Sequence, residues 1–428
     1  MGIRKRILLV AYNFPPLISP QSLRWFYLCR ELSRGGYLID VLTIRMPTAF
    51  RDMVDDVSKE ITIYRTFPGP FYYLTFKYSQ ESSKSEKSGM SVNHSTFWKI
   101  LSGIHFKTYK ILNNLFIPDI YSEWLPFAIK IGLNLTKTKK YDLIISSSEP
   151  RVCHLIGYFL KKKAGVPWIA DYGDPWIYPV PISPEFKCKK KIIERIERNI
   201  LKRVDAISVT SEGIKKLYLE RYPSLNEERI HVVTQGFDPV MFSQVKKEMS
   251  SKFRIVYCGS FYKNLRDPMA FFKAIKEMDK ENIEVIIAGR INEFADILKK
   301  EGLCEKIKYR GFLDHKESLA LQKSATVLLH IGNFTDVQVP GKIYEYFGAE
   351  RPILCIKGID RDLSAELVKR YNKGIMADNK KEDITEGIMK LYELWQKGLL
   401  DASFNLDAVE DLTWRKRAED ISNIIKTL

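Results

Sequence analysis

Short apolar runs alternate along this chain with longer segments in which apolar residues recur every three or four positions. The first three runs are Lys5–Ala11, Tyr37–Ile44 and Tyr141–Ser147, and the alternation continues towards the other end of the chain. Such runs are typical of parallel strands buried on both faces, and the longer segments are typical of amphipathic helices. We therefore predict an α/β fold with two doubly wound, Rossmann-like domains.

The length of the chain and the breaks in this pattern divide it into parts. At 428 residues it is too long for a single hydrophobic core. We predict an N-terminal domain over 1–235 with a mobile or amphipathic insertion at about 70–125, a linker over 236–251, a second domain over 252–405, and a C-terminal helix over 406–428 that packs back on the domains.

Two segments are candidates for contact with a membrane surface. In the insertion, apolar residues with helical spacing, including Trp98 and Phe106, are surrounded by lysines over 97–115. Residues 187–203 form a second amphipathic pattern with a basic polar face. Such helices can bind the interface of an anionic bilayer. A helix packed on its own domain, with a solvated charged face, explains each pattern equally well.

The excess of basic residues narrows the choice of partners. A net charge of +16 attracts nucleic acid, acidic bilayers or phosphorylated substrates. The sequence has no basic recognition helix, zinc knuckle or aromatic RNA-binding signature, so we expect no nucleic-acid partner. An anionic membrane surface and a phosphorylated substrate remain as candidate partners.

The apolar runs and the cysteines indicate a compartment. No run approaches 18 apolar residues, and the first run has the pattern of a strand, so we expect neither a membrane span nor a signal peptide. The six cysteines are scattered without a C-x-x-C pair, which suits a reducing cytoplasm and gives no structural zinc site. We predict a cytoplasmic protein, with peripheral attachment to the inner face of the cytoplasmic membrane as the interpretation of its basic helices.

The stretch 326–356 combines the features of a phosphate site. An apolar strand over Val327–Ile331 is followed by a polar loop, by Pro340 and Gly341 at a helix start, and by Lys342 in the first turn. Backbone N–H groups at such a start can hold a phosphate, and a cation in the first turn is favourable only if an anion binds beside it. An ordinary βαβ crossover with a solvated lysine is the alternative.

Polar residues also follow the first strands of the N-terminal domain. Asn13 and Pro15 lie in the loop after the first strand, and Arg24 begins the next helix, where it could meet an anion. Asp171 and Asp174 follow a later strand and could accept hydrogen bonds or protons from sugar hydroxyls. A surface arginine and loop-capping aspartates are the alternative readings.

Taken in order, several motifs resemble those of the GT-B glycosyltransferases, specifically glycosyltransferase family 4. RILLVAYNFPP is similar to the first strand and acceptor-side loop of that family, and VVTQGFDPVMF to its interdomain turn. YCGSFYKNLRDP stands in the place of the donor-phosphate loop, and VPGKIYEYFGAERPIL in that of the nucleotide-sugar loop and helix. PWIADYGDPW also resembles a motif of a bacterial envelope-polysaccharide subset. The resemblance covers nearly the whole chain, apart from about 48–125.

The resemblance implies transfer of a sugar from a nucleotide-diphosphate sugar, which is a co-substrate and not a resident cofactor. The acceptor would be a saccharide or a lipid-linked saccharide, in bacterial surface polysaccharide such as O-antigen, capsule or exopolysaccharide. The donor would lie on the C-terminal domain and the acceptor on the N-terminal domain, which would face each other across a cleft. Such an enzyme would retain anomeric configuration and would need no metal.

The resemblance also assigns roles to single residues. Lys263 or Arg266 would neutralise the leaving diphosphate, together with backbone N–H groups near Gly259. Glu345 matches the second glutamate of the E-x7-E pattern of the family, which bonds the nucleotide ribose, and the base would stack near Arg290. In full, we predict as catalytic Lys263, Arg266 and Asp174; as donor-binding Gly259, Ser260, Arg290, Gln338, Val339, Pro340, Gly341, Lys342 and Glu345; as acceptor-side Asn13, Pro15, Arg24 and Asp171; and no metal ligand.

One departure from the family pattern keeps other functions open. The first glutamate of E-x7-E would fall near Val337, where Asp336 and Gln338 are the nearest polar residues. A nucleotide-sugar epimerase on the same fold and a non-catalytic GT-B partner subunit are therefore the alternatives.

Overall fold

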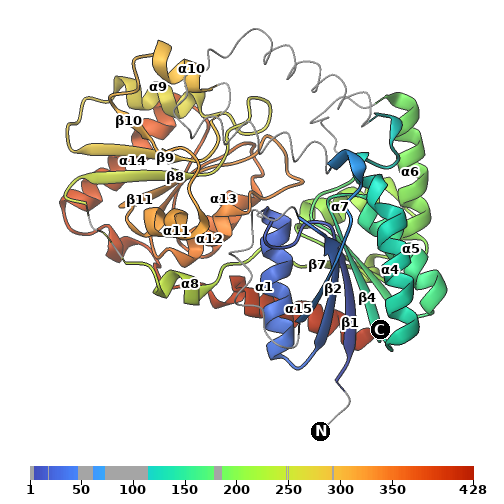
Figure 1. Cartoon of the computed structure of the whole chain (residues 1–428). Helices are drawn as coiled ribbons and strands as arrows, with labels where there is room; N and C mark the ends of the chain where they lie inside the picture. Colours follow the sequence, from blue (N-terminus) through green and yellow to red (C-terminus); the bar gives the residue numbers. More distant parts are fainter. Residues whose placement is uncertain are drawn as a thin grey trace, which may run out of the picture. The chain divides into compact units, whose positions relative to one another are not determined.

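The computed structural model describes residues 4–17, 19–46, 61–72, 114–177, 186–246, 248, 250–291 and 294–428. The chain divides into two compact units (Figure 1), Met1–Val233 with Ala418–Leu428, called unit 1, and Thr234–Arg417, called unit 2. The polar stretch and nearly all of the amphipathic helix expected in the insertion lie outside the described residues.

Unit 1 is built on a seven-stranded parallel sheet with the order β3-β2-β1-β4-β5-β6-β7. The central strands are fully buried, as their unbroken apolar runs predict. The strands are β1 Arg6–Ala11, β2 Leu38–Ile44, β3 Ile61–Thr66, β4 Leu143–Ser148, β5 Trp168–Tyr172, β6 Ala206–Val209 and β7 Ile230–Val232.

Helices cover both faces of this sheet, and Figure 1 shows α4, α5 and α6 side by side on the face opposite α1. Ser19 caps α1 by accepting a hydrogen bond from the N–H of Ser22, and Gly165 ends α5 in the left-handed conformation that glycine favours. The helices are α1 Pro20–Arg34, η2 Ile120–Trp124, α4 Leu125–Thr138, α5 Val152–Ala164, α6 Lys187–Leu201, α7 Glu212–Arg221 and η3 Glu227–Arg229. The last helix, α15 Trp414–Thr427, begins in unit 2 and ends in unit 1.

Unit 2 is built on a six-stranded parallel sheet with the order β10-β9-β8-β11-β12-β13. Its strands are β8 Phe253–Cys258, β9 Ile283–Ala288, β10 Ile307–Tyr309, β11 Val327–Ile331, β12 Ile353–Ile356 and β13 Gly374–Ala377. Its helices are α8 Pro239–Ser243, α9 Met269–Glu277, α10 Phe294–Lys300, α11 His315–Lys323, α12 Lys342–Gly348, α13 Leu363–Arg370, α14 Lys381–Gln396, η4 Asp401–Ser403 and η5 Glu410–Leu412. The prediction of two doubly wound α/β sheets is confirmed.

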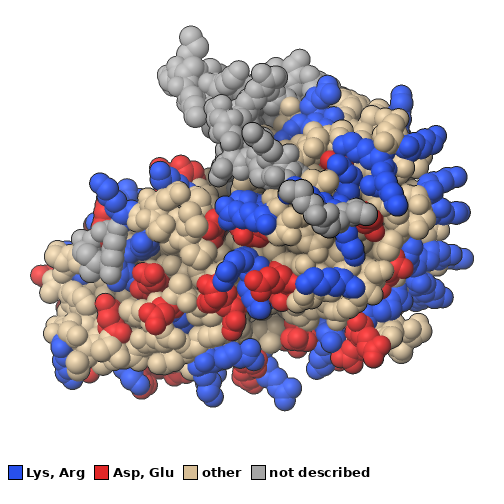
Figure 2. Space-filling model, turned by 90° about the horizontal axis from the view of Figure 1, so that it is seen from below, with Lys and Arg blue, Asp and Glu red and all other residues tan. Residues whose placement is uncertain are grey.

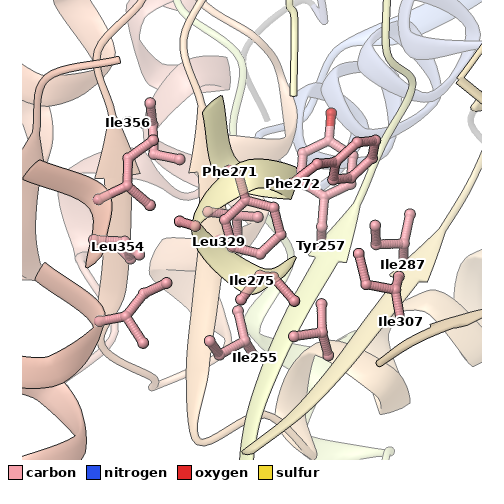
Figure 3. Close-up of a cluster of buried hydrophobic side chains, with 14 of the residues drawn as sticks. Ile255, Tyr257, Phe271, Phe272, Ile275, Ile287, Ile307, Leu329, Leu354 and Ile356 are labelled. Atoms are coloured by element: carbon pink, nitrogen blue, oxygen red, sulfur yellow. The ribbon is translucent and has the colours of Figure 1, made fainter. Parts of the chain in front are cut away.

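Alternate side chains of these strands point to opposite faces of the sheet and form two apolar clusters, one on each face. Figure 3 shows the cluster in which Ile255 of β8 and Leu329 of β11 meet Phe271 and Ile275 of α9. The other cluster lies under α11 and α12 and contains Tyr346. Both faces are therefore closed by helices, and the loops at the strand ends are left to carry function.

The strand order reverses once in each unit, between β1 and β4 in unit 1 and between β8 and β11 in unit 2. In open α/β sheets, ligands bind at the carboxyl ends of the strands, in the crevice at such a switch point. A ligand-binding site is therefore expected at the loops that follow β1, β4, β8 and β11.

Candidate active site

At the switch point of unit 2, Arg266 ties the loop after β8 to the loop after β11. Its Nε and one terminal nitrogen donate to Oδ1 of Asn333 at 3.1 and 2.8 Å, and its other terminal nitrogen donates to the carbonyl oxygen of Ser260 at 3.2 Å. Asn333 is buried and donates in turn to the carbonyl oxygen of Gln338 at 3.2 Å. Arg266 thus fixes the shape of both loops and places its positive charge between them.

Three more of the predicted residues lie at this carboxyl edge. Lys263 follows β8 and Arg290 follows β9, and both are exposed. Gly259 lies against the end of β9, where its N–H donates to the carbonyl oxygen of Ala288 at 2.9 Å. A Cβ on Gly289, whose φ is +120°, would fall 1.9 Å from the carbonyl oxygen of Gly259, so this approach requires glycine. The predicted cations of unit 2 therefore share one edge of its sheet.

Glu345 is the centre of a polar cluster on α12. Lys342 Nζ lies 2.5 Å from its Oε2, Gln322 Nε2 donates to the same oxygen at 3.0 Å, and His315 Nε2 lies 3.5 Å from its Oε1. Burial would raise the pKa of Glu345, but the charge of Lys342 and the hydrogen bond and charge of His315 outweigh burial, and the pKa lies well below its usual range. Glu345 is therefore an ionised group that only accepts hydrogen bonds.

The loop that leads into α12 mixes buried and exposed residues. Pro340 is buried, whereas Gly341 is exposed, and Gln338 and Val339 are half-buried. Val337, at the position where the E-x7-E pattern has its first glutamate, is buried with 4% of its surface exposed. An apolar side chain thus fills that position, and Asp336 beside it is exposed.

Tyr346 seats α12 against the end of β8. Its hydroxyl oxygen accepts a hydrogen bond at 2.8 Å from the backbone N–H of Cys258, the residue before Gly259. His315, Gln322 and Tyr346 had no part in the sequence prediction. For His315 and Gln322 the local signal is the capping box of Asp314 and Glu317, which predicts the start of α11 but not the contact with α12.

In unit 1 the structure corrects the expectation for Arg24 and Asp171, which do not meet solvent. Their side chains are 0% exposed and form an ion pair, with a terminal nitrogen of Arg24 3.0 Å from Oδ1 of Asp171. Gln21 Nε2, Trp25 Nε1 and Ser208 Oγ also donate to the Asp171 carboxylate, at 2.9, 2.8 and 2.7 Å. Arg24 and Asp171 therefore join α1 to β5 inside the unit, and neither presents a charge to a ligand.

The remaining acceptor-side residues lie closer to the surface. Asn13 follows β1 and its Nδ2 donates at 3.2 Å to the carbonyl oxygen of Glu149, which follows β4, so the two loops of the switch point are joined. Pro15 is buried in the first of these loops. Asp174 is half-buried one strand further on, just after Gly173, whose N–H donates to the carbonyl oxygen of Ser148 at 3.1 Å.

Two buried histidines near these edges lie outside the predicted set. His154 of α5 bonds Ser146 Oγ through Nδ1 at 2.8 Å, and His330 is the fourth residue of β11. Burial lowers the pKa of both to about 3, with the charge of Arg266 lowering that of His330 further and the charge of Asp171 partly opposing the shift at His154. Both imidazoles are therefore neutral at physiological pH.

Within the described ranges, no group of three or more histidine, cysteine, aspartate or glutamate side chains is placed to hold a metal ion, and no helix is long and apolar enough to cross a membrane.

Two family models match the chain, one in each unit. Residues 120–236 match the glycosyl transferase 4-like domain, and residues 252–394 match the glycosyl transferases group 1 domain. Together the two matches take in more than half of the 428 residues. An uncharacterized glycosyltransferase of Methanocaldococcus jannaschii is 21% identical over 348 residues, which cover 76% of this chain and 83% of the relative.

Solved structures of similar fold span the whole chain. Sucrose-phosphate synthase from Thermosynechococcus elongatus has a TM-score of 0.68 at 14% identity, over 99% of both chains. HepE of Anabaena, solved in complex with UDP-glucose, has a TM-score of 0.64 at 14% identity, over 99% of this chain and 100% of that one. At such identities the likeness concerns the fold.

The two parallel sheets and their structural neighbours define the class as GT-B, with two Rossmann-like domains. With both family models matched in order, the chain belongs to the GT-B glycosyltransferases that resemble family 4.

Proposed function

We propose that unit 2 binds a nucleotide-diphosphate sugar and that unit 1 binds the saccharide that receives the sugar. The observation that carries the proposal is the edge of unit 2, where Arg266, Lys263 and the Lys342–Glu345 pair lie at the carboxyl ends of β8, β11 and the start of α12. A diphosphate needs cations and backbone N–H groups, and a ribose needs an ionised carboxylate that accepts hydrogen bonds from its hydroxyls.

The chemistry we propose is transfer with retention and without a metal ion. As the bond from the sugar to the diphosphate breaks, negative charge builds on the leaving phosphate oxygens. Lys263 and Lys342 supply positive charge there, and the fixed Arg266 adds to the field without moving. Retention rests on the resemblance to family 4, so we assign no nucleophile.

For Asp174 we propose contact with the acceptor, because it is the half-buried member of the aspartate pair after β5. We propose that the acceptor belongs to bacterial surface polysaccharide and is a lipid-linked saccharide, on the ground that PWIADYGDPW resembles the envelope-polysaccharide subset.

A lipid-linked acceptor implies work at a membrane, and α6 offers a surface for it. We propose that the exposed face of α6, called the basic face, binds anionic headgroups on the inner side of the cytoplasmic membrane. Figure 2 shows lysine and arginine side chains crowded on the right, the side where α4, α5 and α6 lie in Figure 1. On α6, Phe186 at the N-cap and Ile192 are 61% and 42% exposed. The exposed cations of the basic face are Lys187, Lys190, Lys191, Arg195, Arg198 and Lys202.

A thermal-shift panel of UDP-, GDP- and dTDP-sugars tests donor binding. A ligand at ~100 times its dissociation constant adds about 2.7 kcal/mol to the free energy of unfolding, so one nucleotide should raise the melting temperature clearly. Isomerisation of that donor without an acceptor would favour the epimerase instead. A chain that none of these compounds stabilises would favour the non-catalytic subunit.

A further inference from the structure

Unit 2 contains a cavity of about 600 Å³, bounded by α9, α14 and the loop after β11. The described residues that line it include none of the predicted donor residues. Asp267, Phe334 and Asn379 bring it to the carboxyl ends of β8, β11 and β13, the edge at which ligands of such sheets bind. Small-molecule sites have volumes of about 300–1,000 Å³, so the cavity is large enough for a ligand of its own.

Phe334 is the largest apolar side chain that lines this cavity. It is 36% exposed, and its backbone N–H donates to the carbonyl oxygen of Leu265 at 2.7 Å, which joins the loop after β11 to the loop after β8. The preceding residue, Asn333, is buried and bonded to Arg266. The backbone that carries the ring is therefore fixed, and the exposed ring offers a flat apolar contact face to a ligand.

The same cavity has hydrogen-bonding groups that the protein does not use. Among the described residues, the side chains of Lys273, Asn379 and Lys380 take part in no ion pair or hydrogen bond. The amide of Asn379 can donate and accept, whereas the two lysines only donate. Asn379 is half-buried and the lysines are exposed, so all three groups are open to a ligand.

The charges that line the cavity balance one another. Its acidic residues are Asp267, Glu277 and Glu382, and its basic residues are Lys273, Lys380 and Lys381. Lys381 Nζ lies 2.7 Å from a carboxylate oxygen of Glu277, so this pair neutralises itself and forms part of the wall. A balanced lining gives an anion such as phosphate no net attraction. A neutral ligand whose groups both donate and accept hydrogen bonds matches it better.

Sugars combine the features that this lining requires. Their hydroxyls both donate and accept hydrogen bonds, and one face of a pyranose ring carries C–H groups that can pack on an aromatic ring. We propose that this cavity binds a neutral saccharide, with Phe334 against the ring face and Asn379 and Lys380 bonded to the hydroxyls. The site is separate from the donor edge and from the acceptor side of unit 1, and it holds a sugar residue of a glycan on unit 2.

The test measures saccharide binding by the full-length wild type, Phe334→Ala and Asn379→Ala. The probes are methyl β-D-glucoside, lactose, maltose and N,N′-diacetylchitobiose, titrated in saturation-transfer NMR, with inorganic phosphate as the competitor. The matched control is Phe159→Ala on α5, where the phenylalanine is 40% exposed. Thermal unfolding of each protein checks that the fold is kept.

We expect the wild type and Phe159→Ala to bind at least one of these saccharides equally, without competition from phosphate. Phe334→Ala should weaken that binding about tenfold, because the contact with the ring face is lost. Asn379→Ala should weaken it about fivefold, because hydrogen bonds to the hydroxyls are lost.

Three results would overturn the inference: a wild type that binds none of the probes, equal binding by the wild type and Phe334→Ala, or displacement of the saccharide by phosphate. Binding is measured without a nucleotide sugar, so such a failure does not bear on the donor chemistry proposed for the edge of unit 2.

Discussion

Lys342 and Glu345 form an ion pair one turn apart on α12, with Nζ 2.5 Å from Oε2, at the edge of the sheet where both are predicted to meet the donor. His315 and Gln322 hold the same carboxylate from α11. The lysine that should attract the diphosphate is thus oriented by the glutamate that should bind the ribose.

The first prediction concerns this pair. Lys342→Ala should lower kcat/KM for the nucleotide sugar about 100-fold, because a cation beside the leaving diphosphate is lost. It should lower the free energy of unfolding by only about 1 kcal/mol or less, since a partly exposed pair contributes little to stability. Steady-state kinetics and urea unfolding measure the two effects.

Lys381→Ala is the matched control for Lys342→Ala. The side chain of Lys381, on α14, is also 33% exposed, and its Nζ pairs with Glu277 of α9 at 2.7 Å. It should leave the kinetics unchanged. Equal loss of activity in the two variants would show that the effect of Lys342 is not local to a donor site.

The second prediction separates a structural from a ligand-binding role for Asp171. Asp171→Ala leaves Arg24 charged and buried, which should cost about 3–5 kcal/mol in the free energy of unfolding. The double variant Arg24→Met/Asp171→Leu should lose less free energy of unfolding than Asp171→Ala or Arg24→Met alone, because no lone charge remains. Denaturant unfolding measures all three. A stable Asp171→Ala that has lost only acceptor binding would restore the earlier assignment to the acceptor.

The third prediction is a loss of stability in acid that depends on His154 and His330. The pKa of each is lowered to about 3 in the folded chain, so the unfolded chain binds their protons first. The stabilising effect is complete above about pH 6.5, the ordinary pKa, and is lost as pH falls towards 3.

In this window each histidine should contribute a slope of about 1.4 kcal/mol per pH unit to the free energy of unfolding. His330→Gln should therefore show a shallower dependence than the wild type by about that amount, measured by urea unfolding between pH 7 and pH 4. Parallel curves for the two proteins would contradict a neutral, buried His330.

The fourth prediction concerns the basic face of α6. Replacing Lys187, Lys190 and Lys191 by glutamate should abolish flotation with liposomes that contain phosphatidylglycerol, because the attraction to anionic headgroups is reversed. The control changes exposed lysines of unit 2 to glutamate, namely Lys299, Lys300 and Lys397. Equal flotation of both variants would contradict the proposal that the basic face binds anionic headgroups.

The sequence predicted the frame of both sheets because buried parallel strands are marked by unbroken apolar runs. It missed β3, whose residues ITIYRT lie at the edge of the sheet, are exposed or half-exposed at four of six positions, and lack such a run. It placed Lys342 and Glu345 on one helix, since residues three apart on a helix are neighbours. Their contact is therefore the part of the site that local sequence spacing predicts.

Local spacing does not predict which side chain from a distant element will pair with a charged residue. Asp171 at the end of a strand and Arg24 on the helix after the first strand each had the residue type of a ligand-binding group, yet they neutralise each other across 147 positions of sequence. His315 reaches Glu345, and Asn13 reaches Glu149, in the same way. Whether a charged side chain serves a ligand or another side chain is decided by these long-range contacts.

We propose that this chain transfers a sugar from a nucleotide-diphosphate donor bound to unit 2. The most direct measurement incubates the full-length wild type and Lys342→Ala with radiolabelled UDP-, GDP- and dTDP-sugars and a lipid-linked saccharide fraction, and follows label in the acceptor. We expect acceptor labelling from one donor by the wild type, with release of its nucleoside diphosphate, and about 100-fold less labelling by the variant. Donor that stays intact, donor that is only isomerised, or equal labelling by both proteins would contradict it.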